Sequence, residues 1–376
     1  MTEPHSFPPE QDRIDWLLAA LTPGLGSAGM LALLHTFGSL GAARRAELSA
    51  LRRIIRPAAA AALRQATAWP AVEQALAWAR GDEAFLLTLC DADYPLALAQ
   101  TASPPPLLFG LGRRRLLDRP MLAIVGSRSA GPQACATAHD FAAALARHGY
   151  TIVSGLASGI DGAAHRGALD HAAASSVAVI GTGIDRVYPA SHRELARQLA
   201  REGLILSEFP LGARPLAAHF PRRNRIIAGL SAACLVVEAS IASGSLITAR
   251  LAADAGRDVM AIPGSIHHAR ARGCHRLIKD GAALIETVDD VLDVVGRLSD
   301  ATAADTAPTA AAGHPLLDAM GSDAVCLDEL VSRVGLTVAE LYAILLQLEL
   351  EGRIASLPGG RFQRIDPPPD RAASLE

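Results

Sequence analysis

Six short, continuous apolar segments recur through the middle of the chain, and they constrain its fold more than any other feature. They lie at residues 122–125, 151–153, 177–180, 204–206, 235–237 and 259–262. Runs of this length without polar alternation are typical of strands buried on both faces, and each spacing leaves room for a crossover helix. The pattern therefore predicts an α/β domain with a doubly wound parallel sheet, which binds its ligand at the carboxyl ends of the strands.

Small and hydroxyl-bearing residues follow four of these segments, at the edge where such a sheet binds its ligand. They are Gly126, Ser127 and Arg128; Ser154, Gly155, Leu156 and Ala157; Gly181 and Gly183; and Ser243, Gly244 and Ser245. Backbone N–H groups in such turns can bind an oxyanion, although a single glycine there often serves only close packing of helix on strand. Four such turns in one sheet, beside several arginines, predict a phosphate-bearing ligand.

Three arginines, Arg222, Arg223 and Arg225, precede the apolar stretch at 226–230, which we interpret as the first turns of a buried helix. A helix N-terminus already carries partial positive charge, so each cation there costs roughly a few tenths of a kcal/mol unless an anion neutralises it. Solvated arginines or internal ion pairs are the simpler interpretation. A bound anion is the alternative, because Arg222 and Arg225 are three residues apart and share a helix face. Phe220 is a candidate to stack on a base.

Composition limits the classes of function. With 376 residues, half of them apolar, the chain can form two or three domains. Its formal net charge of −3 means that binding to nucleic acid must depend on a local patch. Among the 35 basic residues only Lys279 is a lysine, so arginine supplies the other basic contacts. Five scattered cysteines predict neither a disulfide nor a zinc site, and we expect a cytoplasmic protein without a membrane span.

Two common nucleotide-binding motifs are absent from the sequence. No G-x-x-x-x-G-K-[ST] loop occurs, and the turn at 181–186 lacks the third glycine of the dinucleotide fingerprint, so neither ATP hydrolysis nor nicotinamide chemistry is indicated. Asp161 and His165, four residues apart, could form an acid–base pair. We favour the simpler interpretation, in which Asp161 caps a helix and His165 packs or faces solvent. No histidine spacing predicts a metal site, and His267 and His268 are interpreted as a surface feature.

The two ends of the chain predict smaller domains around the sheet. Residues 12–80 carry an amphipathic helical pattern with a G-x-G turn, which resembles a helix-hairpin-helix or SAM-like unit; such turns also join helices in bundles that never bind DNA. The sheet domain is predicted over 81–298 and a linker over 299–313. Residues 314–366 predict a winged helix, whose reading helix carries Glu340 and Glu349 and would therefore repel a phosphate backbone.

Several motifs in the sheet domain resemble the DNA-processing protein A family, also called DprA or Smf, which acts in natural transformation. The matching segments are IVGSR at 124–128, SGLASGID at 154–161, GTGID at 181–185, FPRRNRIIAGLS at 220–231, VEA at 237–239 and SGSLIT at 243–248. The resemblance implies an extended Rossmann-like sheet between the helical and winged-helix domains. It also implies a protein without catalytic activity, cofactor or metal that binds and protects incoming single-stranded DNA and loads a RecA-type recombinase onto it.

The resemblance also assigns residues to the DNA. By motif position, Arg128 and the segment Arg223, Asn224 and Arg225 should contact the DNA backbone. The loops at 154–157 and 243–245 should add backbone N–H donors. Single-strand-binding protein is a further candidate partner.

A homodimer through the Rossmann-like domain is a further implication of the resemblance. The predicted interface contains Leu277, Ile278 and Leu284, near the last strand and helix of the sheet. An exposed apolar edge of this kind would be buried by a second copy. The alternative is that these residues complete the core of the monomer.

Three positions depart from the pattern of many family members. Ala190 replaces a lysine after Tyr-Pro, Ser158 replaces an arginine, and His275 replaces an asparagine. The first two changes remove positive charge from the predicted groove, and Arg186 and Arg193 are candidates to compensate.

An enzyme is the competing hypothesis. Nucleotide phosphoribohydrolases use a similar sheet with glycine-rich loops, and the turn at 243–248 is similar to their P-G-G-x-G-T-x-x-E loop. Residues 246–250 contain no carboxylate at the position of that glutamate, which argues against this function.

Overall fold

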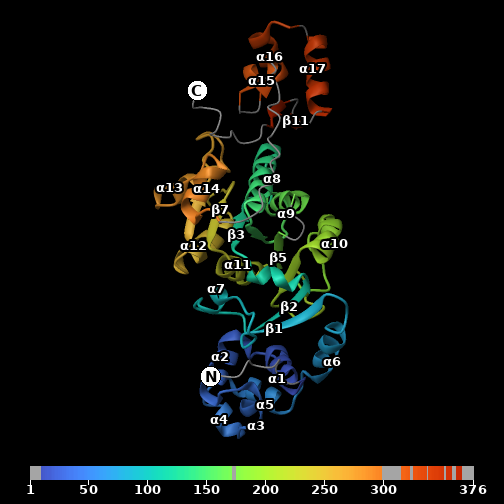
Figure 1. Cartoon of the computed structure of the whole chain (residues 1–376), viewed down its shortest axis with the longest axis vertical. Helices are drawn as coiled ribbons and strands as arrows, with labels where there is room; N and C mark the ends of the chain where they lie inside the picture. The colour runs from blue at the N-terminus through green and yellow to red at the C-terminus, as the bar shows by residue number, and fades with distance from the viewer. Residues whose placement is uncertain are drawn as a thin grey trace.

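The computed structural model describes residues 10–171, 175–298, 315–321, 325–336, 338–350, 353–357 and 361–365. Three parts follow one another along its longest axis: a helical N-terminal part, a central sheet with its helices, and a small C-terminal part (Figure 1). The linker predicted at 299–313 lies outside the described residues. In the part of the chain that is described, no helix is both long and apolar enough to cross a membrane.

The N-terminal part consists of short helices. They are α1 (Glu10–Leu21), α2 (Gly26–Phe37), α3 (Leu40–Arg45), α4 (Leu48–Leu51), α5 (Pro57–Arg64) and α6 (Trp69–Trp78). The predicted G-x-G turn separates α1 from α2, and Gly24 and Gly26 have φ angles of 77° and 65°, which residues with a Cβ rarely adopt. The helices share one hydrophobic cluster with the near end of the sheet, where the ring centroids of Trp78 and Phe109 are 5.7 Å apart. The helical part therefore packs firmly on the sheet.

The central sheet has nine strands in the order β1-β2-β6-β5-β4-β3-β7-β8-β9. The strands are β1 (Ala84–Thr88), β2 (Leu107–Gly112), β3 (Met121–Val125), β4 (Thr151–Ser154), β5 (Ser176–Ile180), β6 (Leu204–Ser207), β7 (Ala233–Val236), β8 (Asp258–Ala261) and β9 (Ala283–Leu284). Strands β1, β2 and β6 pair antiparallel, and every pairing from β6 to β9 is parallel. The doubly wound parallel sheet is confirmed, and the six predicted strands lie within two residues of their predicted bounds.

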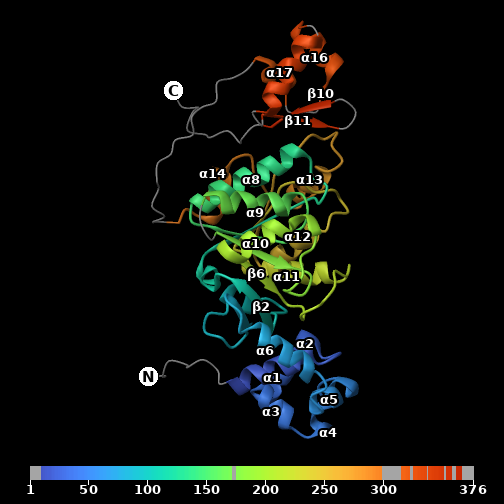
Figure 2. The same ribbon diagram turned by 90° about the vertical axis from the view of Figure 1, so that its right-hand side faces the viewer.

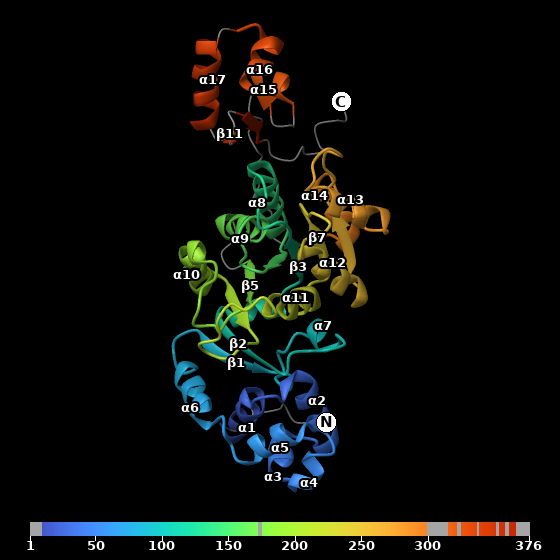
Figure 3. The same cartoon turned by 180° about the vertical axis from the view of Figure 1, so that it is seen from behind.

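Helices cover both faces of the sheet because the strand order reverses between β3 and β7. One face carries α8 (Pro132–Arg147), α9 (Ile160–His171), α10 (Arg193–Glu202) and α14 (Val288–Val295). The opposite face carries α7 (Leu96–Ala99), α11 (His219–Leu230), α12 (Ser245–Asp254) and α13 (Arg272–Lys279). Figure 3 shows α8 and α9 on one side of the strands and α12 and α13 on the other. The carboxyl ends of the parallel strands remain uncovered by these layers.

The C-terminal part has the elements of a winged helix. They are α15 (Pro315–Met320), β10 (Val325–Cys326), α16 (Leu327–Val334), α17 (Val338–Leu350), β11 (Ile354–Leu357) and β12 (Arg361–Arg364), with strand order β10-β12-β11. The part lies against α8, where Gln363 Nε2 donates to Gln133 Oε1 at 2.8 Å (Figure 2). The predicted helix, turn and hairpin wing are all present.

Candidate nucleic-acid interface

A pocket opens where the loops after β3, β4 and β5 meet the first turn of α11. Its cavity volume is about 60 Å³, and its lining consists of Arg128, Gly155, Ala157, Ser158, Gly181, Thr182, Tyr188, Pro189 and Phe220. Five of these residues were predicted site residues: Arg128, Gly155, Ala157, Gly181 and Phe220. The convergence follows from the parallel sheet, because the carboxyl ends of neighbouring strands lie side by side.

An arginine lies over an aromatic ring at this pocket. The guanidinium carbon of Arg128 is 4.9 Å from the centroid of the Phe220 ring, and the rings of Phe220 and Tyr188 are 5.7 Å apart. Arg128 is exposed, and within the described residues it forms no ion pair. A guanidinium over a ring can still direct N–H groups toward a phosphate, and the exposed Tyr188 adds a second ring for stacking. Tyr188 was not a predicted site residue, although it belongs to the Tyr-Pro pair that precedes Ala190 in the family pattern.

The arginine-rich segment lies inside α11, so the expectation that these arginines precede the helix is wrong. The helix begins at His219 because Pro221 falls in its first turn, where the missing N–H breaks no helical hydrogen bond. Arg225 pairs with the buried carboxylate of Glu208, as the interpretation of internal ion pairs expects. Arg222 has a side chain that is 55% exposed, with Nη2 3.7 Å from Glu208 Oε2. Arg222 is therefore the member of this segment that faces solvent.

Arg223 lies beneath the pocket and is only 3% exposed. Its Nη1 donates to the backbone oxygens of Gly155 and Val179, and burial lowers the pKa of its guanidinium to about 10. A Cβ at Gly155 would lie 2.2 Å from Arg223 Nη1, so glycine is needed there. Arg223 supports the floor of the pocket, which differs from its predicted contact with a DNA backbone.

The loop after β4 uses its N–H groups within the protein. The N–H groups of Gly155 and Ala157 donate to Asp161 Oδ2 at 3.1 and 3.4 Å, and Leu156 N–H donates to His165 Nε2 at 3.3 Å. Ser154 is buried, and its Oγ donates to Ile124 O. The prediction that this loop offers free backbone donors to DNA therefore needs correction, because a buried carboxylate and an imidazole already accept from them.

His165 packs in the interior, as the simpler interpretation expected. It is fully buried, and its Nδ1 lies 2.8 Å from Ser176 Oγ. Burial lowers the pKa of His165 to about 3, so the imidazole is neutral. Asp161 is also buried, and burial raises the pKa of its carboxyl group. Neither residue lines the pocket, so the structure gives no support to an acid–base pair acting on a ligand.

The Ser243–Ser245 turn is connected to α11 and stands at the start of α12. Asn224 Nδ2 donates to Gly244 O at 3.3 Å, and the hydroxyl groups of Ser243 and Ser245 are 2.7 Å apart. Gly244 is exposed, and a Cβ there would meet no atom within 4 Å. Ser245 is buried, and the N–H groups of Ser243 and Ser245 donate to Ser240 O at 3.0 Å and to Ser243 Oγ at 3.3 Å. Gly244 is therefore the exposed residue of the turn, and the prediction that this turn offers free backbone donors to DNA also needs correction. The turn does not line the pocket.

Two other predicted glycines serve packing. A Cβ at Gly126 would lie 2.5 Å from Ile160 Cγ1, and Ser127 is buried with its N–H donating to Glu238 O at 2.7 Å. Gly183 is buried, and its N–H donates to Ala213 O at 3.0 Å.

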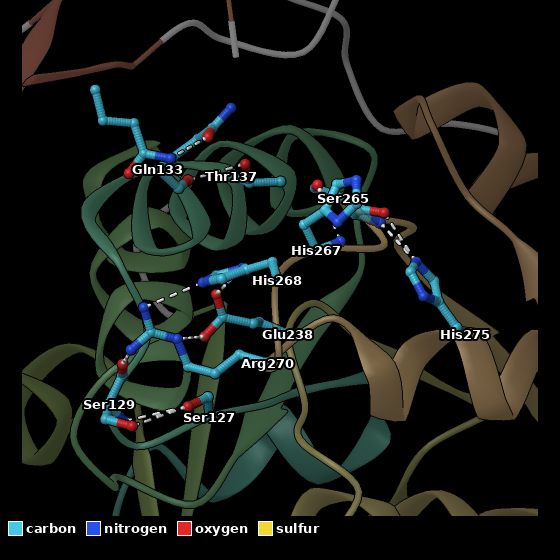
Figure 4. Close-up of polar contacts among 12 residues, drawn as sticks. Ser127, Ser129, Gln133, Thr137, Glu238, Ser265, His267, His268, Arg270 and His275 are labelled. Carbon is cyan, nitrogen blue, oxygen red and sulfur yellow. Dashed lines mark hydrogen bonds and ion pairs between the residues drawn. The ribbon is translucent and has the colours of Figure 1, made fainter. Parts of the chain in front are cut away.

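A charged cluster occupies the point between β3 and β7 where dinucleotide-binding sheets hold their ligand (Figure 4). The buried carboxylate of Glu238 lies 3.4 Å from Arg270 Nε and 4.0 Å from His268 Nδ1, and Arg270 Nη1 donates to Ser129 O at 2.6 Å. Burial raises the pKa of Glu238, and Arg270 opposes that shift. His267 and His268 are exposed, as the interpretation of a surface feature expects, and His268 also lies near this buried carboxylate. The pocket lies toward β4 and β5 instead of at this point.

The residues predicted for the dimer interface have different surroundings. Leu277 and Ile278 on α13 are half-buried and pack against the core of the same chain. Leu284 lies in β9 at the edge of the sheet and is 47% exposed. The monomer's own core therefore accounts for part of this apolar cluster, and Leu284 is its exposed member.

The fold and the pocket define a Rossmann-like protein with a basic, aromatic site at the carboxyl edge of its sheet. Residues 85–296 match the family described as DNA recombination-mediator protein A, and residues 300–360 match the DprA winged helix domain. The chain belongs to this family, which confirms the resemblance drawn from its motifs.

Relatives and solved structures agree with this assignment. The Smf protein of Synechocystis is 39% identical over 320 residues, which cover 74% of this chain and 79% of the relative. The structure of DNA processing protein A from Streptococcus pneumoniae is 36% identical, with a TM-score of 0.67 over 74% of this chain and 97% of that one. The structure of DNA processing protein A from Helicobacter pylori is 30% identical, with a TM-score of 0.51 over 55% and 94% of the two chains. The latter is described for its single-stranded DNA binding mode.

Proposed function

We propose that this chain binds single-stranded DNA at the pocket between Arg128 and Phe220. The observation that carries the proposal is the exposed guanidinium of Arg128 over the Phe220 ring, 4.9 Å from its centroid, beside the exposed Tyr188. A single strand presents phosphates to arginine and unstacked bases to aromatic rings, whereas a duplex keeps its bases stacked. The description of the Helicobacter pylori relative by its single-stranded DNA binding mode supports the same ligand.

Binding is expected to show little preference among bases. Arginine contacts to phosphate and stacking on a ring carry little sequence information. Arg222, whose side chain is 55% exposed on α11, extends the basic rim beyond the pocket. Because the whole chain has a formal net charge of −3, this local rim must supply the attraction, and affinity should fall as salt rises.

The proposal extends to the biological role that the motifs imply. We propose that the chain protects incoming single-stranded DNA in the cytoplasm during natural transformation and loads a RecA-type recombinase onto this DNA. It acts as a homodimer and without catalytic activity, and single-strand-binding protein is a further partner. The family membership of residues 85–296 supports this role.

A paired assay separates this proposal from a phosphoribohydrolase. The full chain is titrated against a labelled single strand and the matching duplex by fluorescence anisotropy, and release of ribose 5-phosphate from AMP is measured in parallel. We expect tighter binding of the single strand and no release. Release of ribose 5-phosphate without DNA binding would support the enzyme, although the first turn of α12, with Leu246 and Ile247, offers no carboxylate for it.

A further inference from the structure

Four buried polar side chains contact the loop at 155–157, whose first and third residues line the pocket. Asp161 and His165 come from α9, His192 from the short 3-10 helix η2 (Ala190–His192), and Arg223 from α11. Each of the four hydrogen-bonds to the backbone of residues 155–157. Segments that are far apart in the sequence thus converge on one short loop.

Leu156, in the middle of this loop, has a left-handed backbone conformation with φ of 56°. A residue with a Cβ persists there only when its surroundings over-determine the conformation. Both polar groups of its backbone are held: the N–H donates to His165 Nε2 at 3.3 Å, and the oxygen accepts from His192 Nδ1 at 3.0 Å. Its side chain is buried in the hydrophobic cluster below. The two histidines therefore clamp the strained residue from opposite sides.

The partners fix the tautomer of both rings. A carbonyl oxygen only accepts, so His192 must carry its proton on Nδ1; an N–H group only donates, so His165 Nε2 must be unprotonated. The remaining nitrogen of His165, Nδ1, lies 2.8 Å from Ser176 Oγ. A Cβ at Gly162 would lie 2.5 Å from the His192 ring, so this glycine lets the ring approach the loop.

The clamped residue lies between two residues of the pocket. Gly155 and Ala157 line the pocket together with Arg128, whereas neither histidine does. Rotation of the Leu156 backbone out of its left-handed conformation would therefore move both lining residues.

We infer that His165 and His192 are positioning residues for DNA binding, which hold Leu156 left-handed and so give the pocket its floor. This inference rests on the proposed function. The two rings hold the loop backbone through hydrogen bonds and do not contact DNA.

Matched substitutions test the clamp in the full-length protein. His165→Leu and His192→Leu remove the ring nitrogens, whereas His165→Gln can return an acceptor near Nε2 and His192→Asn a donor near Nδ1. His139→Leu is the control, because His139 bonds Asp140 and Asp170 away from the pocket. The measurements are affinity for a labelled single strand, melting temperature, and hydrogen–deuterium exchange of residues 155–157.

The leucine variants should lose about tenfold in affinity and exchange faster at 155–157, because a buried backbone group is left without its partner. The affinity of the amide variants should stay within about threefold of that of the wild type. The control should change neither the affinity nor the exchange at 155–157. Folded leucine variants with wild-type affinity and exchange would overturn the inference, as would amide variants that are as impaired as the leucine ones. If the leucine variants unfold, the amide variants test the inference: affinity and exchange close to wild type support it, and a clear loss of affinity contradicts it. If the wild type fails to bind DNA, the proposed function fails, and exchange still tests the clamp.

Discussion

Arg128 and Arg223 have opposite surroundings, although the family motifs assign both to the DNA backbone. Arg128 is exposed over Phe220, whereas Arg223 is buried and donates to the backbone oxygens of Gly155 and Val179. These acceptors lie 68 and 44 residues away in the chain. Local sequence could not predict such burial, because it depends on where α11 meets β4 and β5. Of the four predicted arginines, only Arg128 lines the pocket, whereas Arg222 faces solvent on α11 and Arg225 pairs with Glu208.

Replacing Arg223 by alanine should destabilise the fold. The change leaves two buried carbonyl oxygens without their donor and removes the positive charge that faces the buried Asp161. Leaving a buried carbonyl oxygen without its donor costs about 1–3 kcal/mol. The free energy of unfolding, measured by urea titration, should fall accordingly. A variant with wild-type stability and a weaker dependence of DNA affinity on salt would instead show that Arg223 contacts phosphate.

His139 on α8, which bonds Asp170 on α9, should make stability depend on pH. Hydrogen bonding to Asp140, and secondly to Asp170, raises the pKa of His139 above its usual value of about 6.5. Since the folded pKa is the higher one, the stabilisation is fully present below the unfolded pKa and is lost as pH rises through the folded pKa. The melting temperature of wild type should exceed that of His139→Gln by more at about pH 5.5 than at about pH 8.5. An equal difference at both values would contradict this.

The six strands from β3 to β8 were predictable because buried parallel strands leave continuous apolar runs. The start of α11 was missed because His219, Phe220 and Pro221 carry no capping side chain, although Pro221 was a usable signal for the first turn. Strand β9 was missed because two residues are too few to leave a pattern. The charged cluster around Glu238 was also missed, since it joins residues from separate loops.

The presumed reading helix of the winged-helix part, α17, should contribute little to DNA affinity. It carries Glu340 and Glu349, and Glu349 accepts a hydrogen bond from Ser356 N–H in the wing. Acidic side chains repel phosphate, so a chain of residues 1–298 should bind a single strand within about threefold of the full chain. Anisotropy titrations of both chains measure this. A much larger loss would show that the winged-helix part contacts DNA or shapes the pocket.

The exposed edge of the sheet at β9 predicts that two copies of the chain form a dimer. Leu284 in β9 is 47% exposed, whereas Leu277 packs on the core of its own chain. We expect Leu284→Asp to convert a dimer into a monomer in light scattering at micromolar concentration, with an unchanged melting temperature. Leu277→Asp, the matched comparison, should lower the melting temperature because it places a charge against the core. A wild type that is monomeric under these conditions would refute the dimer.

Single-stranded DNA binding at the pocket between Arg128 and Phe220 is tested by the salt dependence of affinity. Affinity for a labelled single strand is measured over a series of salt concentrations for wild type, Arg128→Ala and the control Arg197→Ala, in which an exposed arginine paired with Glu194 on α10 is removed. Arg128→Ala should weaken binding at every salt concentration and reduce the slope of log affinity against log salt by about 0.7, the value for one phosphate contact to a single strand. The control should leave both unchanged. A folded Arg128→Ala protein with the wild-type affinity and slope would show that the strand binds elsewhere.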